Sequence, residues 1–349
     1  AGWMPINFSS IGAGSPFAAL PIDPENTTSS WKYYRYIVDS KGKYIAVSGL
    51  YSDKYKPEAA KDGGADSEKF EVGTNMSLWE ESKKYYGLVI ENCAGYANCF
   101  TFLNQWADEP NFGGIPYGTC SLGDLNCVDK IAVAKIDGAW TSPDTTAVTI
   151  DGWITSVDNY IKIYTTPTAR HDGKWNTSKY RLQGSNKYHG MLNIYEHFVR
   201  VDGLQIRDTT ISFTGGGSFA AISSYNLPSG DSDIQISNNF LISNNGSTSN
   251  HEYNGGFSGS VNVAQLKMWN NIIVNFWRGI YIYLSSGANY SIYNNTVINS
   301  GDMGMSVSLY GANDTLHLKN EEKHDRRPRV RSFEECKNQP QKQSSEWRR

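Results

Sequence analysis

SIYNNTVINS, residues 291–300, recurs upstream in related form. The related stretches are QISNNFLISN at 235–244, KMWNNIIVNF at 267–276 and a shorter RVDGLQIRD at 200–208. Each has apolar residues alternating with polar ones on both sides of a polar corner, and alternation with period two indicates short β-strands. One such unit cannot bury its own apolar face, whereas stacked units share a core. A recurrence of about 25 residues therefore indicates a solenoid.

Aligning the stretches produces three columns. The first holds Val199, Ile234, Leu266, Tyr290 and Leu316, and the second holds Val201, Ile236, Met268, Ile292 and Leu318. The third holds Asn238, Asn270, Asn294 and Asn320, with Gly203 at the matching place. Asn and Gly tolerate the left-handed backbone of a tight corner, and stacked Asn amides can bond to one another. The third column therefore predicts a structural Asn ladder rather than an active site.

The pattern extends back through residues 149–206, where TIDGW, YIKIYT, RHDGKW, YRL and VRVDGLQI follow one another. This run resembles the right-handed parallel β-helix, or pectate-lyase-like, superfamily, and particularly a type known mostly from metagenomic and viral sequences. The resemblance covers about residues 130–320. It implies an all-β fold, a single-stranded right-handed parallel β-helix, and it implies no particular reaction.

Four segments are expected along the chain. Residues 1–75 form an N-terminal accessory segment, in which WKYYRYIVDSKGKYIAVSGLY (31–51) predicts a β-hairpin about a Ser-Lys-Gly turn. Residues 76–130 hold a capping helix at 77–86, with Ser77 as N-cap and Glu80 completing a capping box, and a cysteine-containing insertion. Residues 131–320 form the β-helix. The charged composition of 321–349 predicts a disordered tail, although an unnatural end of the reading frame also stays open.

Cysteine usage bears on the compartment. Cys93, Cys99, Cys120 and Cys127 lie close together, and their spacings do not match the short C-x₂-C knuckles of structural zinc sites. We expect two disulfides, with the pairing left open, and therefore an oxidising compartment. The chain begins Ala1-Gly2-Trp3, which fits either removal of a signal peptide or a fragment. An extracellular, cell-surface or virion location is expected.

Composition excludes some classes of function. The net charge of −3 gives no argument for nucleic acid as a partner, and no apolar run reaches the length of a membrane span. No motif for a transition metal, a phosphate-binding loop or a dinucleotide is present, so no metal or cofactor is expected unless the protein is a calcium-dependent lyase. Oligomerisation stays possible.

Two clusters are candidate sites. Lyases of the β-helix fold use a basic residue and carboxylate-held calcium, and the densest charged patch on the repeats is Arg200, Asp202, Arg207 and Asp208. The alternative is a set of surface ion pairs. The loop ARHDGKW offers ligand contacts from Arg170, His171, Asp172 and Trp175, or else simply packs on the solenoid. Exposed aromatic residues could stack on sugars, and Trp175, Tyr188, Tyr253 and Trp277 are the candidates.

The sequence favours a secreted or surface-displayed β-helix that binds a polysaccharide or cell-surface glycan without catalysis, because no convincing catalytic set can be assembled. Two alternatives stay open. One is a polysaccharide lyase or glycoside hydrolase of the same fold. The other is a structural subunit of an extracellular filament or particle that associates through residues 1–75.

Overall fold

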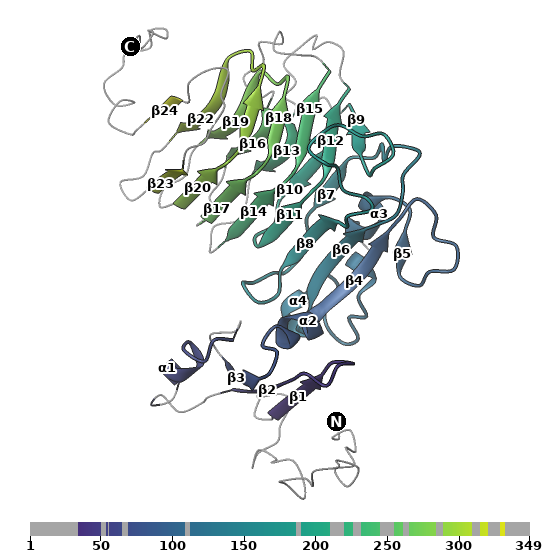
Figure 1. Ribbon diagram of the computed structural model, residues 1–349, viewed down its shortest axis with the longest axis vertical. Helices are drawn as coiled ribbons and strands as arrows, with labels where there is room; N and C mark the ends of the chain where they lie inside the picture. The colour runs from purple at the N-terminus through teal and green to yellow at the C-terminus, as the bar shows by residue number, and fades with distance from the viewer. Residues whose placement is uncertain are drawn as a thin grey trace, which may run out of the picture. The chain divides into compact units, whose positions relative to one another are not determined.

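The computed structural model describes residues 34–49, 54, 56–64, 69–108, 112–185, 190–209, 220–225, 232–244, 255–260, 265–283, 289–308, 315–319 and 329–331. Its contacts divide the chain into two compact units, residues 1–84 and 85–349. Most of the helices and strands of both units are labelled in Figure 1.

The first unit contains an antiparallel sheet in the order β1-β2-β3. The strands are β1 (Tyr34–Val38), β2 (Tyr44–Gly49) and β3 (Lys69–Gly73), and the helices are α1 (Lys56–Ala59) and α2 (Leu78–Lys83). The β1–β2 pair confirms the predicted hairpin. Its turn is closed by Asp39, whose Oδ1 accepts from the backbone N–H groups of Lys41 (2.8 Å) and Lys43 (2.9 Å).

The helix expected over 77–86 is shorter than predicted, since α2 ends at Lys83 and the chain continues directly as a strand. Ser77 provides no side-chain cap, because its hydroxyl donates to Oδ1 of Asn75 (2.7 Å). The helix packs through Trp79, which is 2% exposed, against Ile45 and Val47 of β2. Trp79 therefore anchors α2 to the small sheet.

Among the described residues, the second unit contains three parallel sheets, with nine, seven and five strands. The nine-stranded sheet comprises β4 (Lys84–Val89), β5 (Cys99–Phe100), β6 (Ile131–Ile136), β8 (Ile161–Thr165), β11 (Val199–Asp202), β14 (Asp233–Ser237), β17 (Gln265–Trp269), β20 (Asn289–Tyr293) and β23 (Thr315–Lys319). The seven-stranded sheet comprises β7 (Val148–Ile150), β10 (Leu192–Ile194), β13 (Ala220–Tyr225), β16 (Gly255–Ser260), β19 (Arg278–Tyr283), β22 (Met303–Ser308) and β24 (Arg329–Arg331). The five-stranded sheet comprises β9 (Leu182–Gly184), β12 (Gln205–Asp208), β15 (Phe240–Ser243), β18 (Ile272–Val274) and β21 (Thr296–Ile298).

From β10 to β23 the chain visits the seven-, nine- and five-stranded sheets in turn, and each strand from β10 to β20 pairs in parallel with the strand three places later. This all-β arrangement is consistent with a β-solenoid (Figure 1). The register confirms the second predicted column, in which Val201, Ile236, Met268, Ile292 and Leu318 pair in succession. The apolar columns therefore set the register of the strands.

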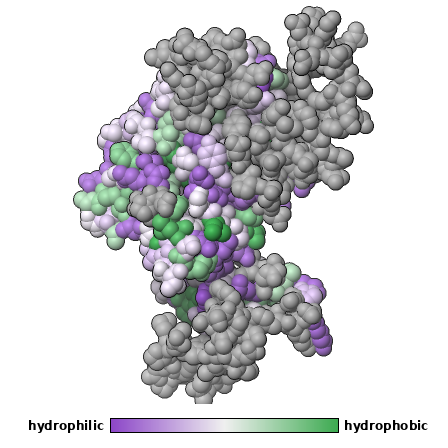
Figure 2. Space-filling view, turned by 180° about the vertical axis from the view of Figure 1, so that it is seen from behind, coloured by the Kyte–Doolittle hydropathy of each residue, from purple (hydrophilic) through white to green (hydrophobic). Residues whose placement is uncertain are grey.

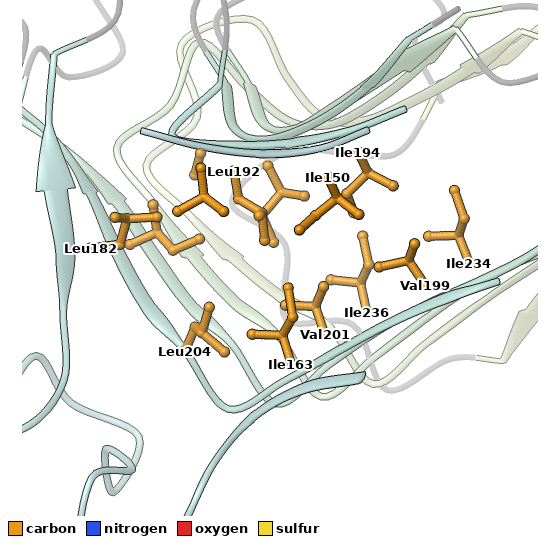
Figure 3. Close-up of a cluster of buried hydrophobic side chains, with 14 of the residues drawn as sticks. Ile150, Ile163, Leu182, Leu192, Ile194, Val199, Val201, Leu204, Ile234 and Ile236 are labelled. Carbon is orange, nitrogen blue, oxygen red and sulfur yellow. The ribbon is translucent and has the colours of Figure 1, made fainter. Parts of the chain in front are cut away.

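The core of the second unit lies between the three sheets (Figure 3). Side chains from all three sheets point toward one another, including Ile150 and Leu192 from one, Val201 and Ile236 from the second, and Leu182 from the third. Each of these side chains is at most 1% exposed. Alternate residues of each strand supply this core, and the residues between them face outward.

Parallel pairing begins earlier than the expected start at residue 131. β4 and β5 already belong to the nine-stranded sheet, although both lie in the segment interpreted as cap and insertion. That segment also forms α3 (Leu103–Ala107), η3 (Phe112–Gly114) and α4 (Leu125–Val128). Trp106 of α3 stacks on Trp153, with ring centroids 5.6 Å apart, so the insertion is part of the core.

The four clustered cysteines form two disulfides, Cys93–Cys99 and Cys120–Cys127. This outcome confirms the expected disulfides and settles their pairing. Each bond joins neighbours in the sequence and closes a small loop of the insertion. Of the predicted tail, Arg329–Arg331 forms β24 beside β22, and the rest of 321–349 lies outside the described residues.

Candidate functional site

The loop of residues 166–179 lies against the corner between the nine- and five-stranded sheets. Arg170 forms an ion pair with Asp202 through its Nη2 and the Oδ2 of the carboxylate. Nε of Arg170 also donates to Oγ1 of Thr165, 3.2 Å away. The structure therefore joins one residue from each candidate cluster.

Asp202 lies directly before Gly203, which stands at the matching place in the predicted Asn column, and the side chains of that column begin at its carboxylate. Its Oδ1 accepts from Nδ2 of Asn238 (2.6 Å), and Nδ2 of Asn270 donates in turn to Oδ1 of Asn238 (3.2 Å). Burial alone would raise the pKa of Asp202, but the hydrogen bonds from Asn238 and Arg170 outweigh burial and lower it. The carboxylate is thus the ionised acceptor at which the ladder begins.

His171 is held by both ring nitrogens. Nε2 lies 2.8 Å from the backbone oxygen of Asn238, and Nδ1 accepts from the N–H of Gly173 (3.1 Å). Because a carbonyl can only accept, we assign the proton to Nε2. Burial lowers the pKa of the imidazole, which also packs edge-on against Phe240. A ring with both nitrogens bonded in this way fixes the loop and has no free nitrogen to act as a base.

Trp175 and Arg207 form the second contact between the two clusters. The Arg207 guanidinium carbon lies 3.9 Å from the Trp175 ring centroid. Indole Nε1 and guanidinium Nε are both buried without a hydrogen-bond partner. Burial, and then the nearby charge of Arg181, lowers the pKa of Arg207. This stack docks the loop onto β12, whereas Asp172 stays exposed.

The remaining charged candidates lie elsewhere. Arg200 lies over the ring of Tyr160, 3.4 Å from its centroid. Asp208 is fully buried on the same side of β12 as the core residue Ile206, and its Oδ2 accepts from Ser243 Oγ (3.0 Å). The four residues Arg200, Asp202, Arg207 and Asp208 therefore do not converge on one point. In the described ranges no three His, Cys, Asp or Glu side chains come together as a metal site would require.

A second and buried ladder lies one residue beyond the predicted one. Asn239, Asn271 and Asn295 are 0% exposed, and Nδ2 of each of the first two donates to Oδ1 of the next, at 2.9 and 2.8 Å. The same oxygens also accept from backbone N–H groups. The N–H of Asn239, for example, donates to Oδ1 of Asn271 (3.0 Å). The outer corner residues Asn238, Asn270 and Asn294 have positive φ, as the corner requires. Asn320 lies outside the described residues.

Outward residues of β14, β17 and β20 form a surface beside the outer ladder, which we call the Trp269 surface. It consists of Asp233, Gln235, Lys267, Trp269, Ser291 and Tyr293. The Trp269 and Tyr293 rings are stacked, with centroids 5.9 Å apart and planes 9° apart, and both are partly exposed. Lys267 Nζ lies 3.3 Å from Oδ1 of Asp233. Exposed Asn270 and Asn294 follow the two aromatic residues directly.

Sequence reasoning missed this pair, although Trp269 and Tyr293 each follow a core residue and precede the Asn-Asn corner. That shared position was the available signal. Of the four aromatic residues that were expected to contact sugars, Trp175 packs on Arg207, and Tyr188 and Tyr253 lie outside the described residues. Trp277 is partly exposed just before β19. Hydrophobic and hydrophilic residues are interspersed on the described part of the face in Figure 2.

Glu196 is a buried carboxylate between β10 and β11. Its Oε1 accepts from the backbone N–H of Trp153 (2.9 Å), and it is 8% exposed. Burial raises its pKa to about 7, against the lowering effect of that hydrogen bond, and the charge of Asp151 adds to the rise. Glu196 thus holds the corner at Trp153, one coil earlier, through this hydrogen bond. With a pKa of about 7, its carboxyl group is partly protonated at neutral pH.

The chain matches no family model, and no similar curated protein or solved structure was found. Among the described helices none is long and apolar enough to span a bilayer.

Proposed function

We propose that this protein is an extracellular right-handed parallel β-helix of the pectate-lyase-like type that binds polysaccharide along its outer surface without catalysis. Support for the fold comes from the cyclic strand order and the three-sided core. Support for the location comes from the two disulfides, which persist in oxidising compartments.

The observation that carries the binding proposal is the stacked Trp269–Tyr293 pair beside the exposed amides of Asn270 and Asn294. Aromatic faces and edges match the C–H faces of sugars, and amides bond to their hydroxyl groups. Successive coils repeat these groups at the spacing of parallel strands, about 4.8 Å. A surface with a repeat of this kind suits a polymer that itself repeats.

The candidate charged clusters support binding over catalysis. Arg170, His171, Asp202, Arg207 and Trp175 hold a loop in place through mutual contacts. Side chains engaged in this way are not arranged as a base beside a calcium site. The proposal therefore assigns these residues to the support of the surface, not to chemistry.

The test is binding of the full chain to a panel of immobilised acidic and neutral polysaccharides, with Trp269→Ala and Tyr293→Ala as variants. We expect each variant to weaken binding about tenfold, the effect of removing one stacking ring. Tyr96→Ala is the matched control, since Tyr96 is an exposed ring (57%) in the insertion. If the wild type binds nothing, or if Trp269→Ala binds like the control, the Trp269 surface is not the binding site.

One observation favours a second candidate, a glycoside hydrolase. Glu196 has the raised pKa of a general acid and senses the charge of the exposed Asp151 on the preceding corner. The assay is release of new reducing ends from the same panel. Loss of this activity in Glu196→Gln, with the free energy of unfolding retained, would establish the hydrolase. A rise in ultraviolet absorbance that depends on calcium would instead indicate a lyase.

A further inference from the structure

The small sheet of the first unit has two chemically different faces. The face toward α2 carries Ile45, Val47 and Glu71, which are buried, and Arg35 and Lys69, which lie over the Trp79 ring. All described charged side chains of the three strands are on this face. Alternation along the strands places the other residues on the opposite, open face.

The open face is built from aromatic and aliphatic side chains around a small centre. Its larger members are Tyr34, Tyr36, Val38, Tyr44, Phe70 and Val72. The middle strand contributes Ala46 and Ser48 between them: Tyr34 pairs with Ser48 and Ser48 with Phe70, while Tyr36 pairs with Ala46 and Ala46 with Val72. Rings and branched side chains thus lie on both sides of a floor made by Ala46 and Ser48, and Tyr44 of the same middle strand lies at one end of this floor.

Exposure shows that this face is accessible over several described residues. Val38 is 60% exposed, Val72 52%, Tyr44 44% and Phe70 37%. Apolar residues exposed together, with no charged residue among them, mark an interaction site. The outer strands lie about 10 Å apart, twice the strand spacing, so a narrow chain fits over the middle strand.

We propose that the open face binds a neutral oligosaccharide chain that lies along β2 over Ala46 and Ser48, with Tyr34 and Phe70 stacking on its sugars from the two sides. Rings on β1 and β3 offer apolar faces, and the tyrosine and serine hydroxyl groups offer hydrogen bonds to sugar hydroxyls. A ligand with carboxylate or sulfate groups would find no cation among the described strand residues of this face. This inference does not rest on the function proposed for the Trp269 surface.

The test uses the full chain and neutral cello-, xylo- and manno-oligosaccharides, with an oligogalacturonate as the charged probe, and measures affinity by calorimetry. We expect at least one neutral probe to bind more tightly than the charged one. Tyr34→Leu and Phe70→Leu should each weaken that binding about fivefold, because the ring is lost. Tyr34→Phe and Phe70→Tyr should stay within about twofold of the wild type because they keep the ring. Lys41→Ala, in the β1–β2 turn, is the control.

Three results would overturn the inference. They are the absence of binding to every neutral probe, unchanged binding in both leucine variants, and conversion of an oligomer to a monomer by those variants in sedimentation, which would make the face an interface between copies. Trp269→Ala separates the two sites. Binding that this variant removes and the leucine variants keep belongs to the Trp269 surface, so the sheet inference would fail and the proposed function would stand.

Discussion

At the scale of single residues, the neighbouring asparagines of each corner have different roles. Asn270 has a positive φ and an exposed amide, whereas Asn271 is fully buried and bonds to both neighbouring coils. Asn271→Ala would leave the backbone N–H of Asn239 without an acceptor and would remove the shorter of the two hydrogen bonds that the Asn239 amide donates. We expect a loss of about 2–4 kcal/mol in the free energy of unfolding, measured by denaturant titration. Asn270→Gly keeps the corner conformation and should cost less than about 1 kcal/mol. Equal losses in the two variants would contradict these roles.

Glu196 gives a prediction about pH. Its pKa is raised to about 7 in the folded chain, mainly by burial, from the ordinary value of 4.5. The folded state therefore binds this proton more tightly than the unfolded state, so the group stabilises the fold below about pH 4.5 and this contribution is lost as pH rises through about 7. The loss is at most about 3 kcal/mol. Glu196→Gln can still accept from Trp153, and the free energy of its unfolding should fall less between these pH values than that of the wild type. The same fall in both proteins would show that another group is responsible.

At the scale of elements, the loop of residues 166–179 depends on its contacts with two sheets. Arg170→Ala removes the ion-pair partner of Asp202 and should favour opening of the loop by about 1–2 kcal/mol, which is roughly a 5–30-fold change in the open fraction. Trypsin should then cleave after the exposed Lys174 correspondingly faster, as followed by mass spectrometry. Asp172→Asn, in the same loop at an exposed position, is the control and should leave the rate unchanged. Equal cleavage of wild type and Arg170→Ala would mean that the other contacts of the loop, including those of His171 and Trp175, hold it without Arg170.

The repeated elements were predictable because their apolar columns fix the register, as the pairing of Ile236, Met268 and Ile292 shows. The hairpin of residues 34–49 was predictable for the same reason, period-two alternation about a turn. The sequence could not predict which asparagine of each Asn-Asn pair turns inward. Both residues are asparagine, and only the geometry of the corner distinguishes them. The insertion was also misread, because Trp106 and Trp153 meet through the fold and not through any local pattern. The Trp269–Tyr293 stack also arises through the fold, because the two residues are 24 positions apart in the sequence and meet only when β17 pairs with β20.

At the scale of the whole molecule, each compact unit has its own core, one around Trp79 and the other between the three parallel sheets. We expect two unfolding transitions in denaturant. Trp79→Ala should shift only the first unit's transition, by about 3–5 kcal/mol, and Ile236→Ala only that of the second, by about 2–5 kcal/mol. Peptide-resolved hydrogen exchange would assign each transition. A single transition that both variants shift equally would show that the chain unfolds as one.

The two ladders have one further property that follows from the direction of their hydrogen bonds. In the outer row the amide N–H groups point toward earlier coils, from Asn270 to Asn238 and on to Asp202. In the buried row they point toward later coils, from Asn239 to Asn271 and on to Asn295. The amide dipoles of adjacent rows therefore oppose each other and largely cancel. Unlike an α-helix, whose aligned peptides build up a dipole along its axis, these corners can be stacked coil upon coil without accumulating partial charge at either end.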